Sequence, residues 1–382
     1  MGPLSGIRVL EFEAIGPVPF CGMMLADMGA DVLLVDRTAD PRLGFGRERW
    51  YDIMMRGRRS VTLDLKSPQG VEAAATLASR ADVVLEGFRP GVMERLGLGP
   101  DVLMAGNRKL VYGRMTGWGQ TGPMAPRAGH DIDYIALSGV LHAIGREGER
   151  PLPPINLVGD FGGGGMMLAF GVAAALLEAK SSGRGQVVDA AMTEGAGLLS
   201  TMVWGMRAAG KWTDVRGVNV LDTGAPWYDT YTTRDGKYFA VGAIEPKFYA
   251  ELLEGLGLAG ESLPPQHERS GWPVLRERFA RAFAQKTRDE WTRIFEGRDA
   301  CAVPVLTFAE ASAHPHAVAR GSHVEVDGIA QPAAAPRFSR TPGAVRQGSP
   351  ERGARGREAL RDWGFDDPGV ERLAALGVGF ER

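Results

Sequence analysis

Short apolar stretches alternate with helical patterns through the first half of the chain, and this alternation limits the possible folds more than any other feature. Four strand-like runs and two helices follow one another, at 7–12, 20–28, 31–35, 68–79, 82–85 and 109–115. Strands that are joined through helices pair in parallel, with the helices covering the sheet. The pattern therefore predicts an α/β fold.

The second half of the chain has a different pattern. The strands expected at 228–233 and 237–243 flank Asp235-Gly236, a pair typical of a hairpin turn. The other elements predicted beyond residue 160 are a strand at 185–189 and helices at 166–180, 193–209, 246–256, 273–285, 287–296, 356–363 and 368–375. Because strands and helices no longer alternate, we place a change of domain near 190–225. Residues 325–350 are rich in Pro, Ala, Arg and Ser, which predicts an extended segment.

Composition excludes several classes of protein. The 44 basic and 46 acidic residues give a net charge of −2, so no bulk field favours nucleic acid or a membrane surface. The two cysteines, Cys21 and Cys301, are too far apart in sequence to indicate a disulfide framework. The first residues lack a targeting pattern, and we expect no segment apolar enough to span a bilayer. These features predict a cytoplasmic protein with neither nucleic-acid nor membrane partners.

A histidine and a carboxylate occur beside predicted helix starts. His130, in Gly129-His130-Asp131, precedes one helix, and Asp160 precedes a run of four glycines. Imidazole titrates near neutrality, and glycines would let a carbonyl oxygen approach the backbone N–H groups of Asp160–Gly162. These are the parts needed to move a proton across a carbon next to a carbonyl. On residues alone, a capping histidine and an N-cap aspartate remain open as the structural alternatives.

Other residues have both a functional and a structural interpretation. Glu245 follows a predicted strand, where it either begins a helix or orients a histidine. Methionines on the helices around the glycine run either fill the core or adapt to variable acyl chains. Five arginines near strand ends are either solvated or recognise phosphates, which arginine suits: Arg37, Arg56, Arg58, Arg59 and Arg89.

Seven sequence blocks, in order, resemble the CaiB/BaiF group of family III CoA-transferases. They are Gly2–Glu11, Leu25–Val32, Arg58–Lys66, Glu86–Val92, Thr116–Pro123, Gly183–Ala190 and Cys301–Leu306. Within this group, Gly129-His130-Asp131 is similar to the motif of the α-methylacyl-CoA racemases. The transferases generally have an aromatic residue in place of His130, and they use an aspartate that matches Asp160 as a nucleophile.

The resemblance implies a Rossmann-like large domain built from both chain ends, plus a smaller α+β domain, in an interlocked homodimer. We accordingly expect the large domain over 1–190, a linker helix over 191–225, the small domain over 226–325, and a return segment over 326–382 that completes the large domain. The active site would lie between the large domain of one subunit and the small domain of the other.

The resemblance also implies an isomerase that interconverts (2R)- and (2S)-2-methylacyl-CoA by two-base proton transfer through an enolate. His130 and Asp160 would be the bases, Asn156 would hold Asp160, and Glu245 of the partner subunit would contact His130. No metal and no cofactor are expected, because coenzyme A is part of the substrate. The five arginines would hold it, together with Gly129, Phe161 and Gly162.

Three alternatives remain at this point. A CoA-transferase would form an acyl anhydride and then a thioester on Asp160. A dinucleotide-binding dehydrogenase fits the opening strands and helix, but the turn Gly16–Gly22 does not have the Gly-x-Gly-x-x-Gly pattern, and its prolines remove N–H donors. A non-catalytic CoA-binding protein would not need His130, Asn156, Asp160 and Glu245 together.

Overall fold

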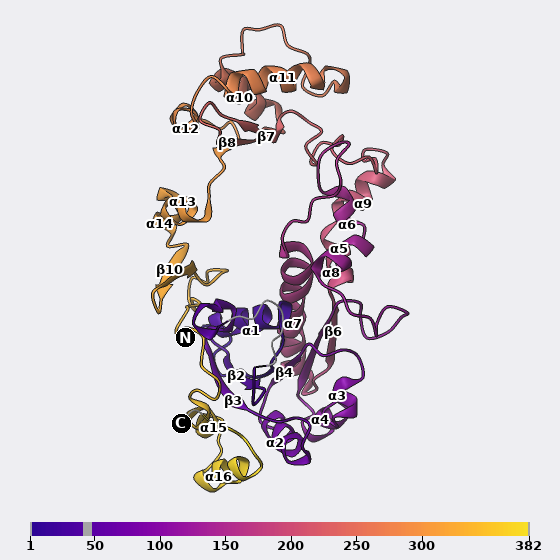
Figure 1. Ribbon diagram of the computed structural model, residues 1–382, viewed down its shortest axis with the longest axis vertical. Coiled ribbons are helices and arrows are strands. Elements are labelled where there is room, and N and C mark those ends of the chain that lie inside the picture. Colours follow the sequence, from indigo (N-terminus) through magenta and orange to yellow (C-terminus); the bar gives the residue numbers. More distant parts are fainter. Residues whose placement is uncertain (1, 41–47, 381–382) are drawn as a thin grey trace. The chain divides into compact units, whose positions relative to one another are not determined.

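The computed structural model describes residues 2–40 and 48–380 and divides into two compact units (Figure 1). The first unit comprises Met1–Ser138, Ile155–Leu199 and Val318–Arg382, and the second comprises Gly139–Pro154 and Ser200–Ala317. Residues 139–154 thus group with the second unit, although they lie within the predicted large domain. An ion pair between Arg146 and Asp229 holds them there.

A six-stranded parallel sheet forms the first unit, in the order β3-β2-β1-β4-β5-β6. This is the strand order of a Rossmann fold, and it confirms the predicted α/β class. The strands are β1 (Arg8–Phe12), β2 (Asp31–Asp36), β3 (Arg58–Thr62), β4 (Val83–Glu86), β5 (Val111–Thr116) and β6 (Val187–Ala191). The order reverses between β1 and β4, where open α/β sheets bind ligands at their carboxyl edge.

Strand β3 was not predicted, because it begins with two arginines. Both are buried by pairing with acids of other strands: Arg58 contacts Glu11 of β1, two strands away, and Arg59 contacts Asp31 of the adjacent β2. These partners lie far away in sequence, so only the folded sheet reveals that the charges are neutralised.

Helices cover both faces of this sheet. One core combines β-strand side chains with α2 (Pro68–Ala78), α15 (Gly356–Asp362) and α16 (Asp367–Ala375). The other packs α1 (Pro17–Asp27) and α7 (Met166–Ser182) against the sheet. The remaining helical elements of this unit are η1 (Arg49–Tyr51), η2 (Ile53–Met55), α3 (Val92–Arg95), α4 (Pro100–Gly106), α5 (Asp131–Leu137), η3 (Leu157–Gly165) and α8 (Met192–Leu199).

The C-terminal segment returns to the first unit. Its helices α15 and α16, yellow in Figure 1, follow an antiparallel hairpin of β10 (His323–Val326) and β11 (Ile329–Pro332). The hairpin overlaps the start of the segment 325–350 that was predicted as extended, and it turns at Asp327-Gly328. Gly379 then pairs with Thr62 of β3 through two backbone hydrogen bonds of 2.8 and 3.0 Å.

The second unit is an α+β arrangement with its own aromatic core. The predicted hairpin is confirmed as β7 (Tyr228–Thr232) and β8 (Tyr238–Gly242), which β9 (Ala302–Pro304) extends. Its helices are α6 (Val140–Ala143), α9 (Thr201–Ala208), α10 (Pro246–Leu256), η4 (Arg269–Gly271), α11 (Trp272–Phe283), α12 (Arg288–Phe295) and α13 (Phe308–Ala313), and α14 (Pro315–Arg320) runs across the boundary between the units. The single helix predicted over 193–209 is two, α8 and α9.

One helical stretch, Leu157–Ser182, is apolar and long enough to cross a membrane, contrary to the prediction from sequence. The prediction failed because Leu, Val, Met, Phe and Ala make up most of this stretch and outweigh the glycines in its mean hydropathy. Within the first unit, however, α7 packs against β5, β6 and α1. This is the position of a covering helix in a soluble α/β protein.

Candidate active site

His130 is the N-cap residue of α5 and is exposed. The cap itself is made by other groups: the backbone N–H of His130 donates to the Asp133 carboxylate at 2.9 Å, and the Asp133 N–H donates to the His130 carbonyl at 2.9 Å. The Asp133 carboxylate therefore caps this end of α5, and the imidazole of His130 is not needed for capping.

Gly129 allows His130 to sit where it does. A Cβ at this position would lie 2.7 Å from the ring of Tyr134 and 2.9 Å from that of Trp118. These two rings meet edge to face at 4.8 Å, and the Tyr134 hydroxyl donates to the Gly129 carbonyl. The peptide before His130 is therefore clamped by aromatic packing, which accounts for Gly129 without a direct role in binding substrate.

Asp160 lies in η3, a π-helical stretch that continues into α7. Its side chain is half-buried, and Asn156, the N-cap residue of η3, donates from Nδ2 to Asp160 Oδ2 at 3.1 Å. The carboxylate also lies against Gly16, where a Cβ would approach Asp160 Oδ2 to 3.2 Å. Gly16 links β1 to α1, so Asp160 lies at the reversal point of the sheet.

Burial raises the pKa of Asp160, and the negative charge of Asp131 raises it further. The hydrogen bond from Asn156 and the charge of His130 oppose this rise. His130 and Asp160 therefore lie within electrostatic range of each other. A carboxyl group with a raised pKa can hold a proton nearer to neutrality, which a general acid requires.

The predicted helix start at Asp160 is wrong. Asn156, not Asp160, is the N-cap, and the backbone N–H of Asp160 donates to the carboxylate of Asp131 at 2.7 Å. In a π-helix each N–H donates to the carbonyl five residues back, which occupies the N–H of Gly162. The Asp160 and Gly162 N–H groups are thus engaged within the protein.

The glycine run is explained by packing between elements. A Cβ on Gly163 would lie 2.5 Å from the backbone N of Ala196 in α8, and a Cβ on Gly165 would lie 2.7 Å from the Pro17 carbonyl of α1. Gly163, Gly164 and Gly165 are buried. The approach that these glycines permit is therefore that of α1 and α8, and not of a substrate carbonyl as predicted.

Three of the five predicted phosphate-binding arginines are buried in ion pairs, which corrects the prediction. Arg56 pairs with Asp27, and Arg58 and Arg59 pair with acids of β1 and β2. Their exposed fractions are 3, 1 and 8 %. Their guanidinium donors are engaged within the protein, which leaves little surface for coenzyme A, and of the three only Arg56 lines the pocket of the described structure.

The other two arginines are placed differently. Arg37 follows β2 and is partly exposed, and Arg89 follows β4 and is exposed. Both therefore lie at the carboxyl edge of the sheet, on either side of its reversal point. Arg89 also acts electrostatically on Tyr134, as Asp160 does, so it belongs to the surroundings of the catalytic candidates.

The remaining predicted residues are divided between the two units. Phe161 packs its ring against Phe20 of α1 with centroids 4.8 Å apart, and Gly162 is half-buried beside it. Glu245 is the exposed N-cap of α10 in the second unit. Its contact with His130 of a partner stays a prediction. Met192 is a core residue of the first unit, whereas Met166 and Met202 are exposed.

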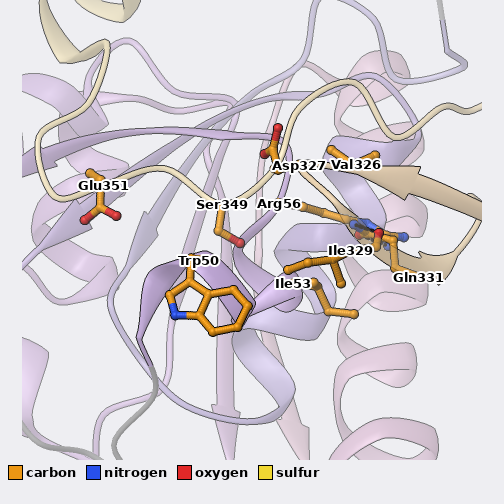
Figure 2. Close-up of a pocket in the computed structure, with 10 residues that line it drawn as sticks. Trp50, Ile53, Arg56, Val326, Asp327, Ile329, Gln331, Ser349 and Glu351 are labelled. Atoms are coloured by element: carbon orange, nitrogen blue, oxygen red, sulfur yellow. Dashed lines mark hydrogen bonds between the residues drawn. The ribbon is translucent and has the colours of Figure 1, made fainter.

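Figure 2 shows a pocket of about 170 Å³ in the first unit, between η1 and the β10–β11 hairpin. Trp50 and Ile53 line one side of it, and Asp327 and Gln331 line the other. It contains neither His130 nor Asp160, and it is smaller than a cavity for a drug-sized ligand. Among residues 2–40 and 48–380, no cluster of three or more His, Cys, Asp and Glu side chains is arranged to hold a metal.

Sequence reasoning did not assign a role to Asp131 or Tyr134. Asp131 is the next residue after His130, and Tyr134 lies four residues after it, one helical turn further along α5. This closeness in sequence to His130 was the available signal. Asp131 contacts the backbone of Asp160, and Tyr134 contacts that of Gly129.

The chain is similar along most of its length to known proteins. The chain is 50 % identical over 373 residues to a mouse α-methylacyl-CoA racemase, covering 97 % of this chain and 96 % of the relative. A human protein of the same name is 46 % identical over 374 residues, with the same coverage. A CaiB/BaiF family protein from Brucella suis has a similar structure, with a TM-score of 0.79 and 26 % identity over 95 % of this chain and 99 % of that one. The model of CoA-transferase family III matches residues 4–356, and the chain belongs to this family.

Proposed function

We propose that the protein is an isomerase that interconverts the (2R) and (2S) epimers of 2-methylacyl-CoA thioesters. The observation that carries this proposal is the pairing of His130 with Asp160, within electrostatic range of each other on adjoining elements. The similarity to proteins named α-methylacyl-CoA racemase supports the substrate class.

The reaction needs one proton acceptor and one proton donor on opposite faces of C2. In one direction the neutral imidazole of His130 takes the α-proton, and the electron pair of the C–H bond moves into the thioester carbonyl to give an enolate. Protonated Asp160 then delivers its proton to the other face of C2, which inverts the centre. The reverse direction exchanges the two roles, and proton exchange with solvent restores each group.

The enolate oxygen requires donors, and α5 can supply them. The first intrahelical bonds of α5 run from Asp133 and Tyr134 to the His130 carbonyl, so the N–H groups of Asp131 and Ile132 precede the hydrogen-bonded ladder. They lie directly after His130. We assign the stabilisation of the oxyanion to these groups in place of the Asp160–Gly162 backbone.

Coenzyme A would be held by Arg37 and Arg89, which flank the reversal point of the sheet. Asn156 fixes the carboxylate of Asp160, and Glu245 of the partner subunit would orient His130. The two-base route moves only protons, so it requires neither a metal nor a redox cofactor. Activity should therefore survive exhaustive treatment with a chelator.

We propose that the active form is a homodimer, located in the cytoplasm. Large apolar side chains on α5, α7 and α8 are exposed in the single chain, an arrangement that marks a protein interface. They include Leu137, Met166, Phe170, Leu177 and Leu198, with exposed fractions of 63, 47, 74, 70 and 61 %. Light scattering after gel filtration should give twice the chain mass of 41.0 kDa.

The deciding experiment supplies one pure epimer of a 2-methylacyl-CoA in deuterated water, with no acid acceptor. Racemisation predicts deuterium at C2 and formation of the other epimer. His130→Ala and Asp160→Ala should each abolish inversion while the protein remains folded. If deuterium does not enter C2 but CoA moves to an added carboxylic acid, the protein is a CoA-transferase in which Asp160 is the nucleophile.

A further inference from the structure

The carboxylate of Asp131 connects the two proposed bases. Its Oδ2 accepts the backbone N–H of Asp160 at 2.7 Å, and the backbone of Gly159 lies close enough to lower the pKa of this carboxylate. In sequence, Asp131 is the residue directly after His130. A single side chain thus joins the first turn of α5, which carries His130, to the helical stretch that carries Asp160.

The surroundings of Asp131 are built for this contact. The residue is only 6 % exposed. Position 159 accepts no side chain, since a Cβ there would lie 2.5 Å from Asp131 Oδ2. The first N–H groups of any helix lack partners within the helix, and Asp131 satisfies one of them in η3, that of Asp160. The glycine therefore leaves room for the carboxylate to reach the backbone.

A buried carboxylate at this position is energetically unfavourable if the contact serves only the structure. Its Oδ1 is buried, and within the described part of the chain it has no hydrogen-bond partner. Burial of a carboxylate with one oxygen unpaired costs free energy, and it raises the pKa of Asp131. A cost of this kind is typically retained where a site requires it.

We propose that Asp131 is a positioning residue that sets the distance between Asp160 and His130 for proton transfer. This inference rests on the proposed function. Asp131 does not touch the reacting carbon in this role, but acts through the backbone of Asp160. A displacement of about 1 Å between reacting groups can cost on the order of 100-fold in rate.

The two bases can be tested separately, because each removes the α-proton from a different epimer. Exchange of that proton for deuterium from a pure epimer reports the base on its side of C2. In Asp131→Ala we expect exchange from the epimer served by Asp160 to fall about 100-fold. Exchange from the epimer served by His130 should change much less, because α5 retains its cap. His130→Ala and Asp160→Ala identify which epimer belongs to which base.

Two further variants keep the test valid if Asp131→Ala does not fold. Asp131→Asn presents an amide oxygen to the Asp160 N–H and should restore both exchange rates to within about tenfold. Asp131→Glu keeps the charge but moves the acceptor by one methylene, and should reproduce the one-sided loss. Circular dichroism and the melting temperature check the fold of each variant.

The outcomes distinguish the inference from the function on which it rests. If the unaltered protein exchanges neither epimer, the proposed function is overturned and the inference with it. If it exchanges both, but Asp131→Ala and Asp131→Glu slow the two epimers equally or not at all, only the positioning role is overturned. A one-sided loss with rescue by Asp131→Asn supports it.

Discussion

Replacement of Arg58 by methionine tests whether the arginines of β3 maintain the fold or bind substrate. Arg58 donates to both oxygens of Glu11, at 2.8 and 3.1 Å, and to the carbonyl oxygens of Met54 and Pro19 at 2.5 and 2.6 Å. Neither side chain of the ion pair is exposed to solvent. Methionine would occupy much of the volume of the arginine, but it would leave these acceptors without donors.

The expected loss is large, because the substitution leaves a buried carboxylate unpaired. Removal of one partner from such a pair costs about 3–5 kcal/mol of unfolding free energy. Burial already raises the pKa of Glu11, and Arg58 opposes that rise. Without Arg58 the folded-state pKa rises further, so the loss is smallest at low pH, where Glu11 is protonated in both states, and grows as the pH rises.

Scanning calorimetry measures this loss as a fall in melting temperature of about 6–20 °C for a unit of this size. A second substitution, Glu11→Leu, should recover most of it, because an apolar pair can replace a buried ion pair. The matched control is Arg89→Met, on the exposed carboxyl edge of the sheet. It should leave the melting temperature within about 2 °C and raise KM for acyl-CoA. An unchanged melting temperature with a raised KM in Arg58→Met would refute this reasoning.

Three further predictions concern the catalytic candidates. Asn156→Leu removes a hydrogen bond that lowers the pKa of Asp160, so the pKa of Asp160 should rise. For the epimer that Asp160 deprotonates, the acidic limb of the kcat/KM profile should therefore move to higher pH. A pH–rate profile whose acidic limb does not move contradicts this. Gly129→Ala places a Cβ within 3 Å of two aromatic rings and should cost about 1–3 kcal/mol in a denaturation experiment, with a larger relative loss of kcat. Gly16→Ala strains a backbone at φ 66° by about 1–2 kcal/mol and places a Cβ 3.2 Å from Asp160 Oδ2. We expect kcat to fall more than KM rises, and unchanged kinetics would show that the Asp160 side chain can move to avoid the contact.

The extent to which the sequence predicts this structure depends on how local each determinant is. The β7–β8 hairpin and the bounds of α10 follow from turn residues and apolar spacing in short windows, and the structure confirms them. Strand β3 was missed because its arginines are neutralised by β1 and β2. Local patterns contain no information on such distant partners.

The candidate site divides in the same way. His130 was correctly expected at the mouth of a helix, because the apolar residues after it repeat at helical spacing. The π-helical stretch around Asp160 was not expected. Its width depends on the close approach of α8, where a Cβ on Gly195 would lie 1.8 Å from the Gly163 carbonyl. The contact of Asp131 with Asp160 likewise depends on how α5 lies against η3.

The return of the C-terminal segment has a consequence for synthesis on the ribosome. Trp363 shares a core with Leu10 and Leu33, and its indole N–H donates to Asp31, which precedes it by 332 residues. At about 5–20 residues per second, translation separates these partners by roughly 17–66 s. The second unit, whose core lies within 225–302, emerges complete during that interval. During synthesis, the face of the first unit's sheet that α15 and α16 cover therefore stays exposed. These helices cover it only after the second unit has had time to fold.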